Sequence, residues 1–323
     1  HQLYLAQEVT NRLQPRVLLA DEVGLGKTIE ACLILHRLHL TGRAERALII
    51  LPEYLMHQWF IELLRRFNLV DSLLDEERCQ AIEGSDPDAN PFLDSQIVCV
   101  SLDYLTRSME RSTQVLEAEW DLLIVDEAHH LEWTPELAIT AYQIVEGLAQ
   151  KIPSVLLLTA TPQQLGPEGH FARLRLLDPA RYNDLETFIE ESGHYQEMAE
   201  LVERIDGQEE LTPADWEMIK KSSSHLHDQY SDKKTLSKAD RAQLIENIID
   251  SFGPGRVMFR NTRKALKGFP KRQPILHPLD LPEEDSSAFE QKIEWLVDWL
   301  GENKEEKVLL ICQTRTLVEE IYQ

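Results

Sequence analysis

LLADEVGLGKT, residues 18–28, is the stretch that decides the fold of this chain. The apolar run at residues 17–20 predicts a buried strand, and residues 28–40 have the apolar spacing of a helix. A strand, a glycine-containing turn, Gly-Lys-Thr and a helix in this order form a phosphate-binding loop. The sequence therefore predicts that this βα unit binds a phosphorylated ligand.

Each residue type in this loop has a physical role toward a phosphate. Gly24 and Gly26 permit unusual backbone dihedrals and bring N–H groups close to phosphate oxygens, and the helix N-terminus adds positive potential. Lys27 is expected to reach the β- and γ-phosphates, and the Thr28 hydroxyl to ligate Mg²⁺. The full pattern has glycine where this chain has Asp21. A glycine-rich turn that caps an ordinary helix is therefore the alternative for the loop taken alone.

A pair of acidic residues forms the second candidate element. Residues 122–125, LLIV, predict a strand that ends in Asp126 and Glu127. An aspartate at the end of a buried strand can hold Mg²⁺ through water, and the adjacent glutamate can polarise an attacking water. A lone Asp-Glu pair also fits an ordinary turn after a strand. Because a candidate phosphate loop precedes this pair, we interpret it as catalytic.

Strands alternate with helices through the first half of the chain. Further apolar strands are predicted at residues 46–51, 97–101 and 154–158, and the alternation predicts βαβ units and an α/β fold with a parallel sheet. Thr159 and Thr161 follow the last of these strands, where their hydroxyls can bond to the acidic pair; a plain Thr-Pro strand stop is the alternative. All these candidates fall at the C-terminal ends of strands, where such sheets bind ligands.

The charge of the chain argues against nucleic-acid binding on average. The chain has 323 residues and a net charge of −23, so it should repel a phosphate backbone. Residues 252–272 are a local exception, because all their charged residues are basic. The candidates for nucleic-acid contact in this segment are Arg256, Arg260, Arg263, Lys264 and Lys267. A basic patch that pairs with the protein's own acidic surface is the alternative.

Composition divides the chain into several parts. The expected parts are a first ATP-binding lobe (1–183), a helical insertion (184–250), the basic end of that lobe with a linker (251–280) and the beginning of a second α/β lobe (281–323). Within them, residues 69–90 and 222–238 are expected to be loop-like. Residues 307–313, KVLLICQ, are expected to form a strand of the second lobe.

Cysteine usage and the absence of targeting segments indicate a cytoplasmic protein. The four cysteines are scattered without a CxxC pair, as expected of core residues in a reducing compartment. The histidines show no spacing that suggests a metal site. No secretory leader or membrane-length apolar run is present. The sequence begins with His and ends within a helical pattern, so we expect it to be a piece of a longer protein.

In this order, the motifs resemble those of superfamily 2 helicase-like ATPases. DEVGLGKT (21–28) is similar to the phosphate loop of the Swi/Snf branch, which has Asp at the position of Asp21. The other similar segments are LIILP (48–52), VSLDYL (100–105), DEAHH (126–130), LLLTATP (156–162), the basic segment and KVLLICQT (307–314). The resemblance extends to bacterial members that associate with RNA polymerase through HQLYLAQEV (1–9), ELLRRF (62–67) and HFARLRLLDPARY (170–182).

The resemblance implies a RecA-like P-loop NTPase lobe with a parallel sheet, a helical insertion and the start of a truncated second RecA-like lobe. It implies ATP hydrolysis with Mg²⁺, coupled to movement on nucleic acid, with duplex DNA and the RNA polymerase core as partners. The process implied is remodelling or recycling of RNA polymerase at the nucleoid. Two alternatives stay open: a strand-separating helicase, and a non-catalytic ATP-responsive module that docks on RNA polymerase.

The resemblance also implies roles for single residues. Lys27, Asp126 and Glu127 are implied to be catalytic, and Thr28 and Asp126 to hold Mg²⁺. Thr159 and Thr161 are implied to couple the nucleotide state to nucleic acid. The implied contacts with ATP are made by Gln2, which would read adenine, and by Asp21, Glu22, Val23, Gly24, Leu25, Gly26, Lys27 and Thr28.

Overall fold

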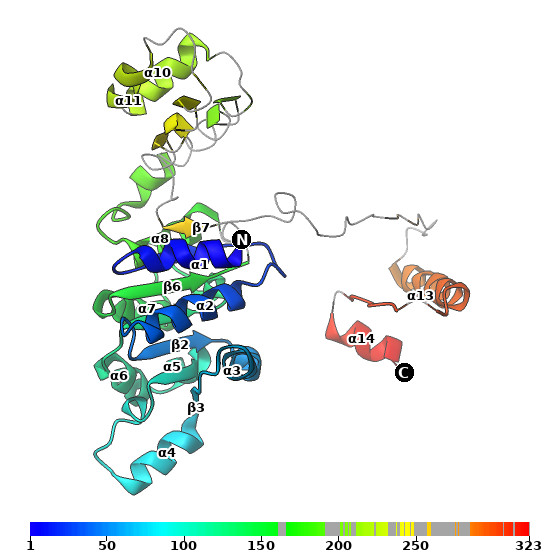
Figure 1. The fold of residues 1–323 in the computed structure, drawn as a ribbon. Coiled ribbons are helices and arrows are strands. Elements are labelled where there is room, and N and C mark those ends of the chain that lie inside the picture. Colours follow the sequence, from blue (N-terminus) through cyan, green and yellow to red (C-terminus); the bar gives the residue numbers. More distant parts are fainter. Residues whose placement is uncertain are drawn as a thin grey trace. The chain divides into compact units, whose positions relative to one another are not determined.

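The computed structural model contains a seven-stranded sheet whose neighbouring strands run parallel (Figure 1). Its strand order is β3-β4-β2-β5-β6-β1-β7. The strands are β1 (Arg16–Leu19), β2 (Ala47–Leu51), β3 (Ser72–Leu74), β4 (Ile97–Ser101), β5 (Leu122–Val125), β6 (Ser154–Leu158) and β7 (Met258–Phe259). The structure describes residues 1–160, 166–190, 211–222, 224–231, 257–259, 285–305, 307–312 and 314–322, with shorter stretches between 201 and 277. The predicted α/β fold with a parallel sheet is confirmed.

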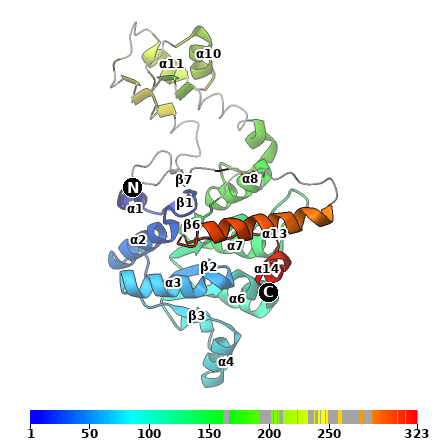
Figure 2. The ribbon, with the colours of Figure 1, turned by 90° about the vertical axis from the view of Figure 1, so that its right-hand side faces the viewer.

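Helices cover both faces of the sheet (Figure 2). Alternate strand residues point to opposite faces: Leu18 and Leu48 enter one core, and Leu19 and Ile49 enter the other. The second core is covered by α1 (Gln2–Asn11), α2 (Lys27–Leu40) and α3 (Met56–Glu62). The first is covered by α5 (Leu102–Arg107), α6 (Met109–Glu117), α7 (Thr140–Lys151) and α8 (Gly166–Leu177). Burial on both faces explains why the strands are continuous apolar runs.

The strand register places the candidate motifs at one edge of the sheet. Leu19 at the end of β1 pairs with Leu158 at the end of β6, and Val125 at the end of β5 pairs with Leu157. Parallel strands end at the same edge, so the segments that follow β1, β5 and β6 leave the sheet side by side. The phosphate loop, the acidic pair and Thr159 are therefore neighbours in space.

The expectation of a loop at residues 69–90 is wrong. This segment contains edge strand β3 and helix α4 (Glu76–Ser85). The side chain of Asp75 caps the helix by accepting the backbone N–H of Arg78 at 2.8 Å. The guanidinium of Arg111, on α6, bonds Glu76 and Glu83, which lie two turns apart on the helix. The acidic residues that resemble a solvated loop in the sequence are thus the docking contacts of a helix.

The expectation of a loop at residues 222–238 is also wrong in part. Residues Ser224–Tyr230 form helix α11, next to α10 (Pro213–Ser222). Leu226 and Tyr230 are buried with Ile219 in a hydrophobic cluster separate from the two cores of the sheet. The helical character expected for the insertion is therefore present in its described residues.

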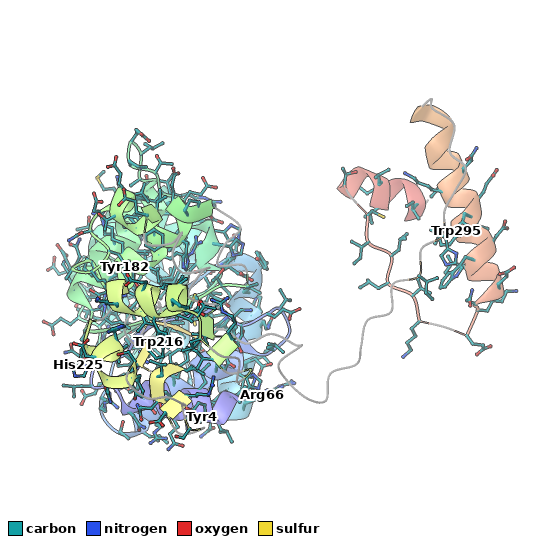
Figure 3. All side chains as sticks on the ribbon, turned by 90° about the horizontal axis from the view of Figure 1, so that it is seen from above. Tyr4, Arg66, Tyr182, Trp216, His225 and Trp295 are labelled. Atoms are coloured by element: carbon teal, nitrogen blue, oxygen red, sulfur yellow. The ribbon has the colours of Figure 1, made fainter. Side chains whose placement is uncertain are left out.

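The chain divides into two compact units, residues 1–267 and 268–323. The second unit contains α13 (Asp285–Glu302) and α14 (Arg315–Tyr322). Its aromatic rings pack around Trp295 (Figure 3), with ring centroids 4.9 Å from His277 and 6.3 Å from Trp299. The shorter helical segments of the chain are η1 (Glu53–Leu55), η2 (Leu63–Phe67, a π-helix), η3 (Pro91–Leu93) and η4 (Ala128–His130).

The strand expected at residues 307–313 is not formed in the described residues 307–312. A strand needs a neighbouring strand for its backbone hydrogen bonds, and the described part of the second unit contains none. Leu309 and Ile311 are both 84% exposed. An apolar run of strand-forming residues is therefore insufficient to form a strand when no neighbouring strand pairs with it.

Candidate active site

The loop between β1 and α2 has the backbone of a phosphate-binding loop. Gly24 has φ = 82° and Gly26 has φ = 93°, both in the left-handed region that favours glycine. Gly26 is also the residue that precedes the first turn of α2. A Cβ atom at Gly26 would lie 2.2 Å from Nε2 of Gln2, so a side chain at this position would be strained by the backbone conformation and would displace the Gln2 amide.

The side chain of Gln2 contacts this loop directly. Its amide nitrogen donates hydrogen bonds to the carbonyl oxygens of Leu25 at 3.0 Å and Gly26 at 3.3 Å. Helix α1 is thereby joined to the loop at the position where Gln2 is expected to contact adenine. The adenine contact itself stays a prediction.

The remaining loop residues differ in exposure and in their contacts. The Lys27 ammonium donates to the carbonyl oxygen of Asp21 at 2.9 Å, so it lies over the loop. Asp21 is fully buried, and Val23 is 60% exposed. Thr28 is partly exposed in the first turn of α2, where its hydroxyl is available to a cation. Glu22 and Leu25 complete the turn, with the Leu25 N–H donating to the Glu22 carbonyl at 3.1 Å.

Asp126, directly after β5, is held by two neutral donors. One carboxylate oxygen accepts the indole N–H of Trp59 at 2.8 Å, and the other accepts the backbone N–H of Glu127 at 2.8 Å. Burial raises the pKa of Asp126, while the Trp59 bond and the charge of Lys27 act in the opposite direction. The register of β1, β5 and β6 brings the loop and the acidic pair to the same edge of the sheet.

Trp59 has a second role that its sequence position does not indicate. The sequence predicts a core residue, and the ring is fully buried on α3. Its N–H, however, orients one carboxylate oxygen of Asp126. An indole at helical spacing is typical of a core, and only the tertiary structure shows which acceptor its N–H meets.

Glu127 has a strained backbone at the start of the loop after Asp126. Its φ is 49°, a left-handed conformation that is uncommon outside glycine. Its carboxylate lies 3.1 Å from Nδ1 of His129. Burial, followed by the charges of His130 and Arg173, lowers the pKa of His129. Strained residues of this kind concentrate at functional sites, where the surroundings hold a side chain in one direction.

The coupling and nucleic-acid candidates are only partly described. Thr159 is fully buried after β6, and its N–H donates to the Leu19 carbonyl at 3.0 Å, between the two candidate loops. Thr161 lies outside the described residues. The basic candidates also lie outside them: Arg256, Arg260, Arg263, Lys264 and Lys267.

A groove of about 1160 Å³ borders the acidic pair. Pro52 and Tyr54 follow β2, Leu102 and Asp103 follow β4, and Glu127 closes the side toward the loop. These lining residues belong to the LIILP and VSLDYL segments and their surroundings. The phosphate loop and the groove are thus two surfaces at the same edge of the sheet, and the acidic pair lies between them.

The residues present fit ATP with Mg²⁺. The loop has glycine at both positions with left-handed backbone, and its lysine points back over the loop. Thr28 and Asp126 supply oxygen atoms, the ligand type that Mg²⁺ prefers. Among the described residues, no helix is both long and apolar enough to cross a membrane.

Comparison with known proteins identifies the family of this chain. The model of the SNF2-related domain matches residues 4–320. RNA polymerase-associated protein RapA of Vibrio parahaemolyticus serotype O3:K6 is 44% identical over 370 residues, covering 100% of this chain and 38% of the relative. RapA of Vibrio cholerae serotype O1 is 52% identical over 300 residues, covering 89% of this chain and 30% of the relative. The chain thus spans well under half of the length of these relatives.

Among solved structures, the Sulfolobus solfataricus SWI2/SNF2 ATPase core in complex with dsDNA has the same fold. The TM-score is 0.52 at 16% identity, over 99% of this chain and 56% of that one. The resemblance inferred from DEVGLGKT and DEAHH is confirmed by the family match and by the RapA relatives. The chain belongs to the SNF2-related family of helicase-like ATPases.

Proposed function

We propose that this chain is the ATP-binding motor lobe of a Swi/Snf-type translocase that hydrolyses ATP with Mg²⁺. The observation that supports this most is the arrangement of Asp126, whose carboxylate is oriented by Trp59 at the sheet edge that also carries the glycine loop. A structural turn has no need for an oriented carboxylate beside a glycine loop. A nucleotide site needs both.

Each side chain has a distinct task in this proposal. Lys27 moves from the Asp21 carbonyl to the β- and γ-phosphates, and Thr28 and Asp126 hold Mg²⁺, which when bound neutralises phosphate charge. Glu127 orients and deprotonates the attacking water. Gln2 reads adenine, and residues 21–28 surround the phosphates. Thr159 and Thr161 relay the nucleotide state to the groove.

We further propose duplex DNA and the RNA polymerase core as partners, and polymerase remodelling or recycling in the cytoplasm as the process. Support for the polymerase comes from the RapA relatives, which are named for that association. Support for DNA comes from the basic segment 252–272 in an otherwise acidic chain. In domain terms, we propose the first RecA-like lobe (1–183), the insertion (184–250), the basic end and linker (251–280) and the beginning of a second lobe (281–323).

The test is ATP turnover by the longer protein that contains this chain, with and without duplex DNA, RNA and RNA polymerase. Lys27→Ala should abolish turnover, because the γ-phosphate loses its cationic contact. Lys151→Ala is a matched control: this exposed lysine bonds the Leu116 carbonyl away from the loop. Full turnover by Lys27→Ala would refute the site.

The same experiment separates the two other functions. A translocase moves on duplex DNA without releasing strands, so strand displacement in parallel with ATP turnover would indicate a helicase. Polymerase binding without any ATP turnover would indicate a docking module.

A further inference from the structure

Helix α1 lies beside α2 and is tied to it at both ends (Figure 1). Gln2, in the first turn of α1, bonds the carbonyl oxygens of Leu25 and Gly26, which directly precede α2. At the other end, Arg43 follows α2 and bonds the carbonyl oxygen of Thr10 in the last turn of α1. The two helices therefore run in the same direction, with their N-terminal ends together at the phosphate loop and their C-terminal ends together at Arg43.

The guanidinium of Arg43 joins the C-terminal ends of the two helices. It donates hydrogen bonds to the carbonyl oxygens of Thr10 and Arg12, and to that of Leu13 at 2.8 Å. The last carbonyl groups of a helix have no acceptor role within the helix, and the rigid fork of an arginine can bond several such oxygens together. Two helix C-termini at one place also add negative potential, which a cation offsets. Arg43 thus fixes where α1 ends relative to α2.

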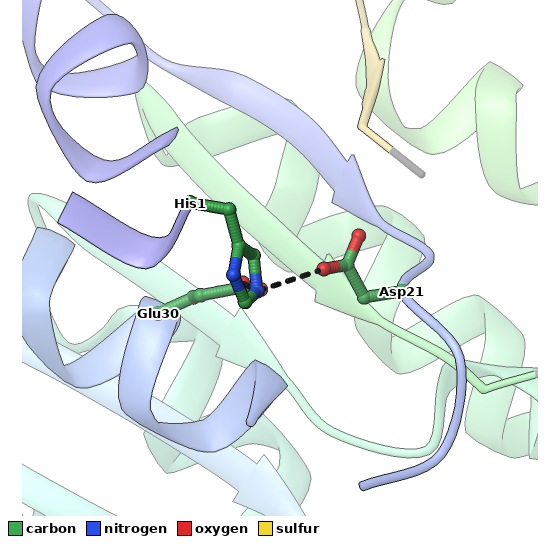
Figure 4. Close-up of side chains that lie close together, drawn as sticks. All are labelled: His1, Asp21 and Glu30. Carbon is green, nitrogen blue, oxygen red and sulfur yellow. Dashed lines mark ion pairs between the residues drawn. The ribbon is translucent and has the colours of Figure 1, made fainter. Parts of the chain in front are cut away.

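The N-terminal end of α1 is seated on the phosphate loop by two side chains. The amide nitrogen of Gln2 occupies the space that a Cβ atom of Gly26 would need. The imidazole of His1, directly before the helix, lies 3.3 Å from a carboxylate oxygen of Glu30 and 3.7 Å from one of Asp21 (Figure 4). A small movement of α1 along its axis would therefore change the place of Gln2 over the loop.

Apolar packing between the two ties sets the buried face of α1. Leu5 and Val9 of α1 lie in the same buried core as Leu35 of α2. A helix of ten residues is marginal by itself, so α1 depends on these contacts. Apolar packing is non-directional, whereas hydrogen bonds require defined distances and angles. The hydrogen bonds at the two ends therefore determine the position of α1 along α2.

We propose that Arg43 is a positioning residue that holds Gln2 in place for the recognition of adenine. This inference rests on the proposed function, in which Gln2 reads the base. With its amide nitrogen bonded to the loop, Gln2 has its amide oxygen to accept a hydrogen bond from the amino group of adenine. Guanine has an acceptor oxygen at the same place, so a correctly placed amide oxygen discriminates between the two bases. Arg43 acts on this contact from the far end of a helix about 15 Å long.

The test is steady-state turnover of ATP and GTP by the longer protein that contains this chain. Arg43→Met removes the fork of donors and keeps an apolar stem. The KM for ATP should rise about 3- to 10-fold, the factor that one net hydrogen bond contributes. The kcat should stay unchanged, because the groups proposed for catalysis are untouched. The ratio of kcat/KM for ATP to that for GTP should fall by a similar factor.

The same substitution in a Gln2→Ala background separates positioning from a general structural role. If Arg43 acts through Gln2, Arg43→Met should leave the KM for ATP unchanged once Gln2 is replaced. An equal fold-change in both backgrounds would overturn the proposal, and so would an unchanged KM in the single variant. Arg37→Met, at an exposed arginine in the last turn of α2, is the matched control and should match wild type.

Arg43→Lys provides a second, more conservative variant. It keeps the positive charge at the helix ends and lacks the rigid fork, so its KM for ATP should lie between those of wild type and Arg43→Met. Circular dichroism checks that each variant is folded. Arg43→Lys carries the same comparison with Gln2→Ala if Arg43→Met does not fold.

Two measurements without turnover keep this inference separate from the proposed function. In the absence of nucleotide, Arg43→Met should exchange the amide hydrogens of residues 5–11 faster than wild type, and Arg37→Met should not. Unchanged exchange in Arg43→Met would overturn the tie. Displacement of a fluorescent ATP analogue by ATP and by GTP measures base preference directly. If wild type bound ATP without hydrolysing it, the proposed function alone would be refuted, and the displacement constants would still test Arg43.

Discussion

Asp21 and Asp126 are two buried aspartates that follow parallel strands at the same edge of the sheet, yet their surroundings differ. Asp126 receives hydrogen bonds from neutral donors, the Trp59 indole and the backbone N–H of Glu127. Asp21 faces a second buried carboxylate, Glu30, and an imidazole. Neutral donors orient a carboxylate while leaving its charge for a ligand. A facing carboxylate instead disfavours the ionisation of both carboxyl groups.

The comparison shows that equivalent positions in a parallel sheet can have different electrostatic surroundings. The Asp126 carboxylate is oriented by neutral donors at the sheet edge that also carries the phosphate loop. Asp21 lies beside the buried carboxylate of Glu30 and the imidazole of His1.

The largest effect is expected at Glu127. Glu127→Gln should lower ATP turnover by about 10²–10⁴-fold in the longer protein, the usual contribution of a general base. Binding of ATP should remain, because the amide keeps the shape of the side chain. Stopped-flow turnover and a nucleotide-binding titration measure the two quantities.

Glu132→Gln is the matched control for this change. It removes one carboxylate from an exposed position of the same loop, and its turnover should match wild type. Equal turnover of Glu127→Gln and wild type would exclude Glu127 as the base.

A smaller effect is expected at Trp59, which supports the Asp126 carboxylate from behind. Trp59→Phe removes the buried N–H donor and should cost about 2–3 kcal/mol of unfolding free energy, since a charged acceptor is left without its partner. The Mg²⁺ concentration for half-maximal turnover should rise several-fold. Urea unfolding and a Mg²⁺ titration measure these effects.

Trp120→Phe separates orientation from loss of volume. Trp120 is a buried indole of the same unit whose N–H bonds the Val115 carbonyl instead of a carboxylate. The Trp120→Phe variant should have a lower free energy of unfolding than wild type, and the Mg²⁺ dependence of its ATP turnover should be unchanged. If both variants had the same Mg²⁺ dependence, the positioning role of Trp59 would be wrong.

The contact of α4 with α6 should be less costly to break. Arg111→Leu removes the guanidinium that bonds Glu76 at 2.9 Å and also bonds Glu83. The free energy of unfolding should fall by about 1–2 kcal/mol, because the glutamates are partly exposed to water in the wild type. Hydrogen exchange should increase in residues 76–85 and stay unchanged in the phosphate loop; equal protection of α4 in both proteins would contradict this.

The smallest effect is the acid dependence of the same contact. The Arg111 guanidinium, together with hydrogen bonds from Tyr104 and Gln80, lowers the pKa of Glu76 from 4.5 to about 2. A lowered pKa in the folded state means that this stabilisation is present above pH 4.5 and is lost as pH falls toward 2. The difference in urea stability between wild type and Glu76→Gln should therefore shrink over this interval, whereas exposed Glu77→Gln should show no such trend.

The strands and the phosphate loop were predictable because their causes are local. Residues 122–125 and 154–158 are apolar runs that only a strand covered on both faces accommodates, and Gly24 and Gly26 permit the dihedrals that the loop adopts. The acidic helix α4 was not predictable in this way. Its charged residues resemble a solvated loop until Arg111 is seen to bond them from α6.

The sequence by itself determined the strands β1, β2, β4, β5 and β6, the glycine loop and the candidate acidic pair, because periodicity and dihedral preference depend on neighbouring residues. Only the tertiary structure decided that Trp59 bonds Asp126, and that His1, Asp21 and Glu30 converge. It also showed residues 307–312 without strand structure. The physical reason is shared: hydrogen-bond partners, charge compensation and strand pairing depend on residues that are distant in the chain, and folding alone determines which of them meet.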